Sequence, residues 1–164
     1  MNFRPRLASW GLPVLLFGVP LCAALALEHA SAAGQKAAPI RFRDVSGQTI
    51  QFIGYSTSIV LTAEQQALKT RVLEKIPAPC CKQYPVATCC CPCNLARSVW
   101  GLSNYLIVEK NVSAAELDRT VKQWIRFTNA RGYSGDECNT GGCDRPFSES
   151  GCGGMHSSHV VASR

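Results

Sequence analysis

Six cysteines lie within fourteen residues of this chain, between Cys80 and Cys93. Two of them are adjacent, at Cys80 and Cys81, and the others form the run Cys89-Cys90-Cys91-Pro92-Cys93. Packing does not explain this density, because a buried cysteine packs as a small hydrophobe and an aliphatic residue would serve equally well. The pattern predicts thiol chemistry, metal binding or cross-linking.

Cys90 and Cys93 form a Cys-x-x-Cys pair directly before a segment that we expect to be helical. Unpaired N–H groups and the dipole at the start of a helix stabilise a thiolate, which moves a cysteine pKa below its free value of about 8.5. We therefore favour thiol–disulfide exchange, with Cys90 as the nucleophile and Cys93 as the resolving cysteine. These are the two predicted catalytic residues of an oxidoreductase that requires no cofactor.

A site for a soft metal is the alternative interpretation of the same sulfurs. Cys89, Cys91 and Cys93 alternate, and the spacing from Cys90 to Cys93 is that of half a zinc site. Thiolate ligands suit copper as Cu(I) and zinc. The predicted metal ligands are Cys80, Cys81, Cys89, Cys91, Cys93, Cys138 and Cys143.

Structural disulfides are the third interpretation, which would make the chain a stapled interaction protein without catalysis. Cys138, Cys143 and Cys152 favour it, because they lie in a Gly- and Ser-rich tail that has few other anchors. His156 and His159 follow Cys152 at ligand-like spacing, but histidines in a Ser-rich terminus are more typical of solvated tail residues.

The first 32 residues have the marks of a secretory signal peptide. Arg4 and Arg6 precede an apolar stretch from Leu7 to Leu27, and Ala30-Ser31-Ala32 offers a cleavage site. We expect residues 1–32 to be removed and the mature protein to be periplasmic or secreted, an oxidising setting that permits disulfides. A retained membrane anchor is the alternative, since the apolar stretch is long enough to span a bilayer.

Cleavage would remove Cys22 and leave nine of the ten cysteines, and it would lower the formal net charge from +6 to +5. That excess is scattered, without a basic run or basic residues interleaved with aromatic ones, so we expect no nucleic-acid partner and, after cleavage, no membrane partner. The sequence contains no Ser-His-Asp set, no paired carboxylates and no Gly-rich phosphate loop.

Two segments before the cysteines have different periodicities. Residues 33–39 are small and polar, which predicts a flexible leader. Ile40, Phe42, Ile50 and Phe52 then alternate with polar residues, which predicts a short β-hairpin, and residues 56–61 would add a third strand.

Three helices are expected around the cysteine run. Thr62 and Gln65 have the spacing of a capping box at the N-terminus of the first helix. Asn94 is the expected N-cap of the second helix, and Ser113 pairs with Glu116 at the N-terminus of the third. Each of these N-termini is followed by apolar residues at helical spacing, and we expect the third helix to end at Gly132. The buried positions predicted in this way are Leu68, Val72 and Ile76, then Leu95, Val99, Leu102 and Leu106, then Leu117, Val121, Trp124 and Thr128.

The predicted fold is mainly α. A single domain over residues 40–135 combines the β-hairpin with a compact three-helix bundle, and an irregular cysteine-containing tail covers residues 136–164. A thioredoxin fold is rejected, because Tyr84 to Thr88 is too short a strand signal before the Cys-x-x-Cys pair and the following sequence is helical.

With these elements in this order, residues 61–135 resemble the periplasmic thiol-reductant proteins of cytochrome c maturation, the CcmH type. The similar segments are Leu61-Thr62-Ala63-Glu64-Gln65, Asn94-Leu95-Ala96-Arg97, Ser113-Ala114-Ala115-Glu116-Leu117 and Arg131-Gly132-Tyr133. The run Cys89 to Cys93 is also similar to the Cys-x-Cys-x-Cys element of exported PCYCGC-motif proteins. The first resemblance implies a three-helix bundle that reduces or handles a cysteine-containing partner such as apocytochrome c.

Overall fold

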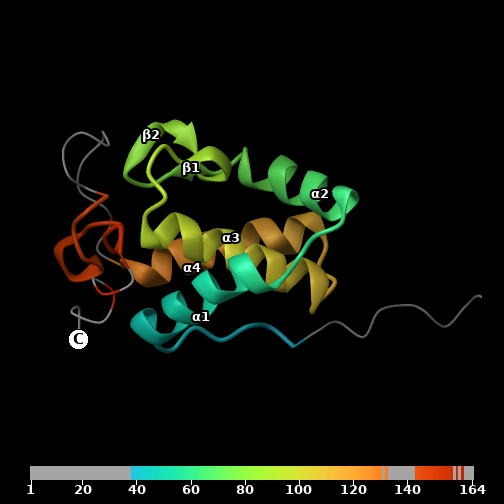
Figure 1. Ribbon diagram of the computed structural model, residues 1–164, viewed down its shortest axis with the longest axis horizontal. Coiled ribbons are helices and arrows are strands. Elements are labelled where there is room, and N and C mark those ends of the chain that lie inside the picture. Colours follow the sequence, from blue (N-terminus) through green and yellow to red (C-terminus); the bar gives the residue numbers. More distant parts are fainter. Residues whose placement is uncertain (1–37, 131, 133–142, 157, 159, 161–164) are drawn as a thin grey trace, which may run out of the picture. The chain divides into compact units, whose positions relative to one another are not determined.

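Four helices carry half of the residues that the structure describes (Figure 1). The structure is a computed structural model that describes residues 38–130, 132, 143–156, 158 and 160. The chain divides into two units, and all of these residues belong to the second, Lys36–Arg164. Helix α3 is central among the described elements, because it packs against α1, α2 and α4.

Helix α1, Val45–Ser58, occupies the segment for which the sequence predicted a β-hairpin, so that prediction is wrong. Its buried residues are Ser46, Thr49, Phe52 and Ile53, which recur every three or four positions as a helix requires. Two of the four are small and polar, so the apolar alternation of Ile50 and Phe52 concealed the helical period. Gln48 completes the start of the helix, where its Oε1 accepts hydrogen bonds from the backbone N–H groups of Arg43 and Asp44.

Glycine 101 explains how closely α1 and α3 pack. A Cβ atom at Gly101 would overlap the backbone carbonyl of Phe52 and lie 2.7 Å from the backbone nitrogen of Ser56. Only glycine permits this approach of the two helix backbones.

Helix α2, Ala63–Leu73, begins with the predicted capping box. Gln65 N–H donates to Thr62 Oγ1 and Thr62 N–H donates to Gln65 Oε1. The helix is followed by strand β1, Pro77–Ala78, and strand β2, Cys81–Pro85, which pair antiparallel. The small sheet therefore lies beside the cysteines and not at the N-terminal side of the helices.

Helix α3 is Asn94–Val108 and helix α4 is Ala114–Thr128. The predicted cap of α4 is confirmed, since Ser113 Oγ accepts a hydrogen bond from Glu116 N–H. The predicted cap of α3 is wrong by one residue, because Cys93 is the N-cap and Asn94 is the first helical residue. The predicted stripe of α4 is buried in full at Leu117, Val121, Trp124 and Thr128.

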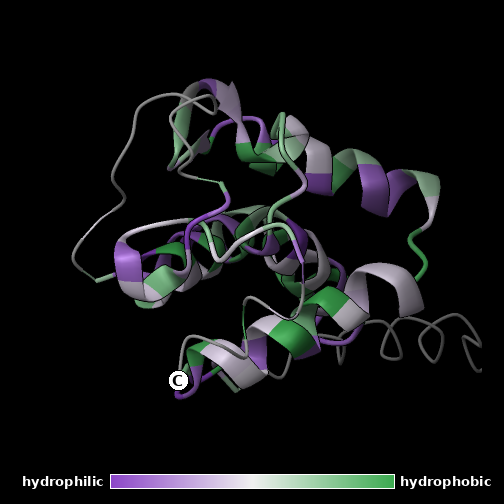
Figure 2. Ribbon diagram, turned by 60° about the vertical axis from the view of Figure 1, so that its left-hand side comes forward, coloured by the Kyte–Doolittle hydropathy of each residue, from purple (hydrophilic) through white to green (hydrophobic). Residues whose placement is uncertain are grey.

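Aromatic side chains fill the centre of the helical unit. Trp124 has no exposed surface, and its ring centroid lies 4.9 Å from that of Phe52 and 5.1 Å from that of Phe42. Hydrophilic and hydrophobic residues alternate along the helical ribbons in Figure 2, as expected for helices with one buried face. The mainly α class is thus confirmed, with α1 as a helix that the predicted three-helix bundle lacked. None of the helices among the described residues has the length and apolar character needed to span a bilayer.

Candidate metal centre

Four cysteines reach the interior from three separate parts of the chain. Cys80 lies in the turn between β1 and β2, Cys93 is the N-cap of α3, and Cys143 and Cys152 lie in the C-terminal segment. All four are free thiols and all are buried, with exposed fractions between 0% and 4%. The tertiary fold therefore brings together cysteines that are far apart in the sequence.

The C-terminal segment is held against the first turn of α3. Asn94 Nδ2 donates hydrogen bonds to the carbonyls of Gly153 and His156 at 2.8 and 2.7 Å. The backbone N–H groups of Asn94 and Leu95 donate to the carbonyls of Gly154 and Cys152. Because these N–H groups have no partner within the helix, the segment serves as its cap and places Cys152 beside Cys93.

Gly153 has a positive φ of 80°, and a Cβ atom there would collide with the ring of Phe147. The glycine therefore lets the segment turn tightly beneath this ring.

The sulfurs of the buried cysteines meet at short distances. The Sγ atoms of Cys80, Cys93 and Cys152 all lie within 4.8 Å of one another, and Cys143 Sγ lies 3.8 Å from Cys80 Sγ. The half-buried Cys89 also interacts with Cys80 and Cys93. We call these five residues, Cys80, Cys89, Cys93, Cys143 and Cys152, the inner cluster.

Two members of the inner cluster carry the negative charge. Hydrogen bonds from Cys80 and Cys93 lower the pKa of Cys89 to about 3. A hydrogen bond from Cys93, aided by further bonds from Cys91 and Cys80, lowers the pKa of Cys143 to about 6. Both groups are therefore thiolates at neutral pH.

The other three members of the inner cluster are the proton donors. The pKa of Cys80 is raised by its hydrogen bond to Cys152 and then by that to Cys89. The pKa of Cys93 is raised first by its hydrogen bond to Cys143. For Cys152, the bond from Cys80 lowers the pKa, but its own bond to Cys93 and its burial outweigh this and raise it.

Cys81, Cys90 and Cys91 form a second group, which we call the outer group because it contains the exposed Cys90, although Cys81 is itself buried. Cys90 Sγ lies 3.9 Å from Cys81 Sγ and 3.7 Å from Cys91 Sγ. Cys90 is exposed and disulfide-bonded, and Cys81 and Cys91 are free thiols. Burial is the first cause that raises the pKa of Cys91 to about 11, and its hydrogen bond to Cys143 links the two groups.

The predicted residues are thus divided between two environments. Of the predicted catalytic pair, Cys90 is exposed and in a disulfide, whereas Cys93 is a buried free thiol, so this disulfide does not join them. Of the predicted metal ligands, Cys80, Cys89, Cys93 and Cys143 meet in the inner cluster. Cys81 and Cys91 belong to the outer group, and Cys138 lies outside the described residues.

Cys152 is the member of the inner cluster that the predicted metal set omitted, because its Gly- and Ser-rich surroundings favoured a structural staple. Cys143 and Cys152 are free thiols in the structure, which corrects the prediction of disulfides for these two. The sequence did contain a signal for the position of Cys152, because Gly153 and Gly154 follow it directly. Their positive φ angles permit the tight turn that packs this segment against α3. His156 is exposed, and His159 lies outside the described residues.

The inner cluster has the dimensions of a thiolate metal site. Metal–sulfur bonds of about 2.3 Å directed to the corners of a tetrahedron place neighbouring sulfurs about 3.8 Å apart. The distance from Cys80 Sγ to Cys143 Sγ equals this edge, at 3.8 Å, and is far longer than a disulfide bond of about 2.05 Å. The sulfurs of Cys80, Cys93 and Cys152 lie within 4.8 Å of one another, which exceeds this edge by no more than about 1 Å.

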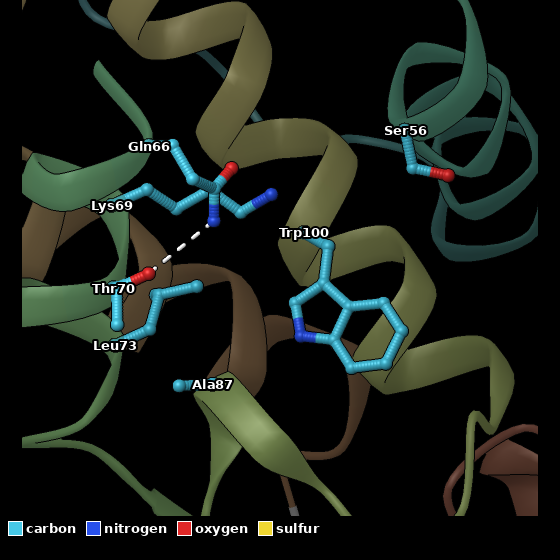
Figure 3. Close-up of a pocket in the computed structure, with 7 residues that line it drawn as sticks. All are labelled: Ser56, Gln66, Lys69, Thr70, Leu73, Ala87 and Trp100. Atoms are coloured by element: carbon cyan, nitrogen blue, oxygen red, sulfur yellow. Dashed lines mark hydrogen bonds between the residues drawn. The ribbon is translucent and has the colours of Figure 1, made fainter. Parts of the chain in front are cut away.

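A pocket beside α2 and α3 offers a contrast (Figure 3). Its volume is about 280 Å³, and its lining residues are Ser56, Gln66, Lys69, Thr70, Leu73, Ala87 and Trp100. Lys69 Nζ donates to Asn104 Oδ1 at 2.8 Å, and burial lowers the pKa of Lys69. None of these lining residues is a cysteine, histidine or carboxylate, so the pocket has neither a nucleophile of the thiol type nor a set of metal ligands.

Comparisons of the chain with models of protein families, with curated proteins and with solved structures found no match. Its function must therefore be argued from the site.

Proposed function

We propose that this protein is an exported soft-metal-binding protein that holds copper or zinc in the inner cluster. The observation that supports this proposal is the convergence of buried Cys80, Cys93 and Cys152, with their sulfurs within 4.8 Å and no disulfide among them. Thiolates are the ligands that Cu(I) and zinc prefer. Metal binding would displace the remaining thiol protons, which pass to solvent.

Burial argues for metal binding over exchange as the role of these sulfurs. A thiol that attacks a disulfide of another protein must be reached by that partner, and the exposed fractions of Cys80, Cys93 and Cys152 are 0% to 1%. A metal ion needs only a small opening, and a water-excluding site strengthens its bonds to thiolates. Metal binding therefore gives a role to all three residues, whereas exchange gives a role to Cys93 at most.

Elemental analysis of protein purified without oxygen or chelators tests the proposal, with Cys80→Ser and Cys81→Ser as matched variants. The two residues are adjacent and both are 1% exposed, but only Cys80 is in the inner cluster. We expect bound copper or zinc in the wild type, a loss of affinity of at least about tenfold in Cys80→Ser, and little change in Cys81→Ser. Metal-free wild-type protein that also fails to bind either added ion would refute the proposal.

Thiol–disulfide exchange is a second candidate, supported by the exposed, disulfide-bonded Cys90. In the exchange, a thiolate of a partner protein attacks the Cys90 disulfide and forms a mixed disulfide, and the displaced cysteine leaves as a thiolate. A second partner thiolate then releases Cys90, so the partner is oxidised and this protein reduced. Apocytochrome c, with paired cysteines, is the kind of partner proposed.

Trapping of the mixed disulfide tests this second candidate. Cys90→Ser should abolish covalent capture of a reduced two-cysteine peptide, whereas Cys80→Ser should retain it, because Cys80 is buried away from the partner. Non-reducing gels and intact mass would measure the adduct. Equal capture by wild type and Cys90→Ser would exclude Cys90 as the exchanging residue.

A further inference from the structure

We infer that the inner cluster binds more than one Cu(I) ion through shared thiolates, and is not a site for a single zinc ion. This inference rests on the proposed metal-binding function and specifies its metal and its form. The number of converging sulfurs and the pattern of their contacts carry it.

The inner cluster has more sulfurs than one ion needs. A structural zinc site is complete with four ligands and leaves no open position. Cys80, Cys93, Cys143 and Cys152 would fill such a site, and the half-buried Cys89, which interacts with Cys80 and Cys93, would remain beside it. An additional ion gives Cys89 a role, because two ions that share a bridging sulfur use all five ligands.

Two of the sulfurs are placed to act as bridges. Cys80 Sγ lies 3.8 Å from Cys143 Sγ, and the Sγ atoms of Cys80, Cys93 and Cys152 lie within 4.8 Å of one another. Both Cys80 and Cys93 also interact with Cys89. A thiolate that bridges two metal ions must lie among the ligands of both, as Cys80 and Cys93 do. Thiolates bridge neighbouring Cu(I) ions readily, since Cu(I) is satisfied by two or three sulfurs.

The chemical uniformity of the cluster favours Cu(I) or zinc over harder ions, and the surplus of sulfurs then favours Cu(I). The candidate metal-binding group found among the described residues contains cysteines alone, without a histidine or carboxylate. Purely soft ligands select soft ions, whereas imidazole and carboxylate oxygen also suit harder ones. Burial further protects Cu(I), because oxidation of the ion requires access of oxygen and water.

The half-buried Cys91 provides a route for the metal between solvent and the inner cluster. Its thiol contacts Cys143 on one side, and its Sγ is 3.7 Å from that of Cys90 on the other. A Cu(I) ion delivered to the free thiol of Cys91 could therefore pass to Cys143 by exchange of one ligand at a time.

An anaerobic titration of the full chain with Cu(I) as its acetonitrile complex, in competition with a chromophoric Cu(I) chelator, tests the inference. Native mass spectrometry would count ions per chain, and luminescence in the visible range would report a solvent-shielded Cu(I)–thiolate cluster. We expect at least two tightly held Cu(I) ions per chain. Cys89→Ser should lower that number with the fold retained by circular dichroism, whereas Cys81→Ser should leave it unchanged.

Alkylation of the wild type provides a measurement that does not depend on the folding of a variant. Loading with Cu(I) should protect all five inner cysteines from alkylation, as located by peptide mass. Saturation at one ion per chain, with Cys89 still alkylated, would overturn the shared-thiolate inference and leave the proposed metal function intact. Failure of both Cu(I) and zinc to compete with the chelators would overturn both.

Discussion

Trp124 and Cys80 lie in two parts of one interior that are filled in different ways. Around Trp124, the rings of Phe42 and Phe52 pack at centroid distances of 5.1 and 4.9 Å, and helices supply the contacts. Around Cys80, the neighbours are other thiols on a turn, a helix start and the C-terminal segment. The first region excludes water by apolar area, whereas the second buries polarisable and partly charged groups that offer little hydrophobic stabilisation. The helical region is thus able to fold by packing, and the cysteine region needs a further source of stability.

Trp124→Ala is the largest predicted perturbation of the helical region. We expect it to lower the free energy of unfolding by about 3 to 5 kcal/mol, because a large buried side chain is lost. It also removes the hydrogen bond from Trp124 Nε1 to Ser98 Oγ at 2.9 Å. Denaturant unfolding followed by circular dichroism would measure the loss.

Cys90→Ser is the control for Trp124→Ala, since Cys90 is an exposed member of the outer group. Its cost in stability should be the smaller of the two. The opposite order would mean that the cysteines staple the helical unit, and the distinction between the two regions would fail.

Gly101→Ala tests the contact between α1 and α3. The added Cβ would overlap the Phe52 carbonyl, which is backbone and cannot rotate away, so we expect a loss of about 1 to 3 kcal/mol or more in thermal or denaturant unfolding. Gly54→Ala is the matched control within α1, because a Cβ there meets no atom within 4 Å. Gly54→Ala should be neutral or stabilising by up to about 1 kcal/mol, and similar losses in both variants would contradict the close-contact argument.

Asn94→Ala connects the two regions. Its loss leaves the carbonyls of Gly153 and His156 without this donor, at a cost of about 1 to 3 kcal/mol. Hydrogen exchange should rise first in residues 152–156, and metal affinity should fall because Cys152 is positioned by this segment. The exposed Gln66→Ala should change stability by less than about 0.5 kcal/mol, and unchanged exchange at residues 152–156 in Asn94→Ala would contradict the prediction.

The pH dependence of Lys69 is the smallest predicted effect. Burial lowers its folded-state pKa below 10.5, so between those two values the unfolded chain binds more protons and stability rises with pH. The free energy of unfolding of wild type relative to Lys69→Met should therefore increase as the pH rises from neutrality towards 10.5. A constant difference over that range would show that the Lys69 ammonium is not desolvated.

The helices α2, α3 and α4 could be predicted because their apolar stripes, and for α2 and α4 also their caps, are local signals in the sequence. Thr62 with Gln65, Ser113 with Glu116 and the stripe through Trp124 all act within one or a few turns. Helix α1 could not be predicted in this way, because its buried face uses Ser46, Thr49 and the space left by Gly101 on another helix. The helical spacing of the buried residues of α1 can be recognised only when the structure of α3, against which α1 packs, is known.

The candidate site was predictable in kind but not in membership. The density of cysteines marked the segment from Cys80 to Cys93 as a candidate site, yet density could not separate the inner cluster from the outer group. Cys80 and Cys81 show the reason, since they are adjacent in sequence but their sulfurs have different neighbours, Cys143 for one and Cys90 for the other. Cys152 was missed because a tertiary hydrogen bond from Asn94 places it, and no local pattern encodes that bond.

The cap on α3 also has a consequence for the order of folding. Asn94 and its hydrogen-bond acceptor Gly153 are separated by 59 positions in the chain. During synthesis the first turn of α3 must therefore wait, with its N–H groups open to water, until nearly all of the chain has emerged. Until then the Cys93 thiol, which the folded protein buries, is accessible to oxidants, so oxidation at Cys93 is expected to be fastest during this interval.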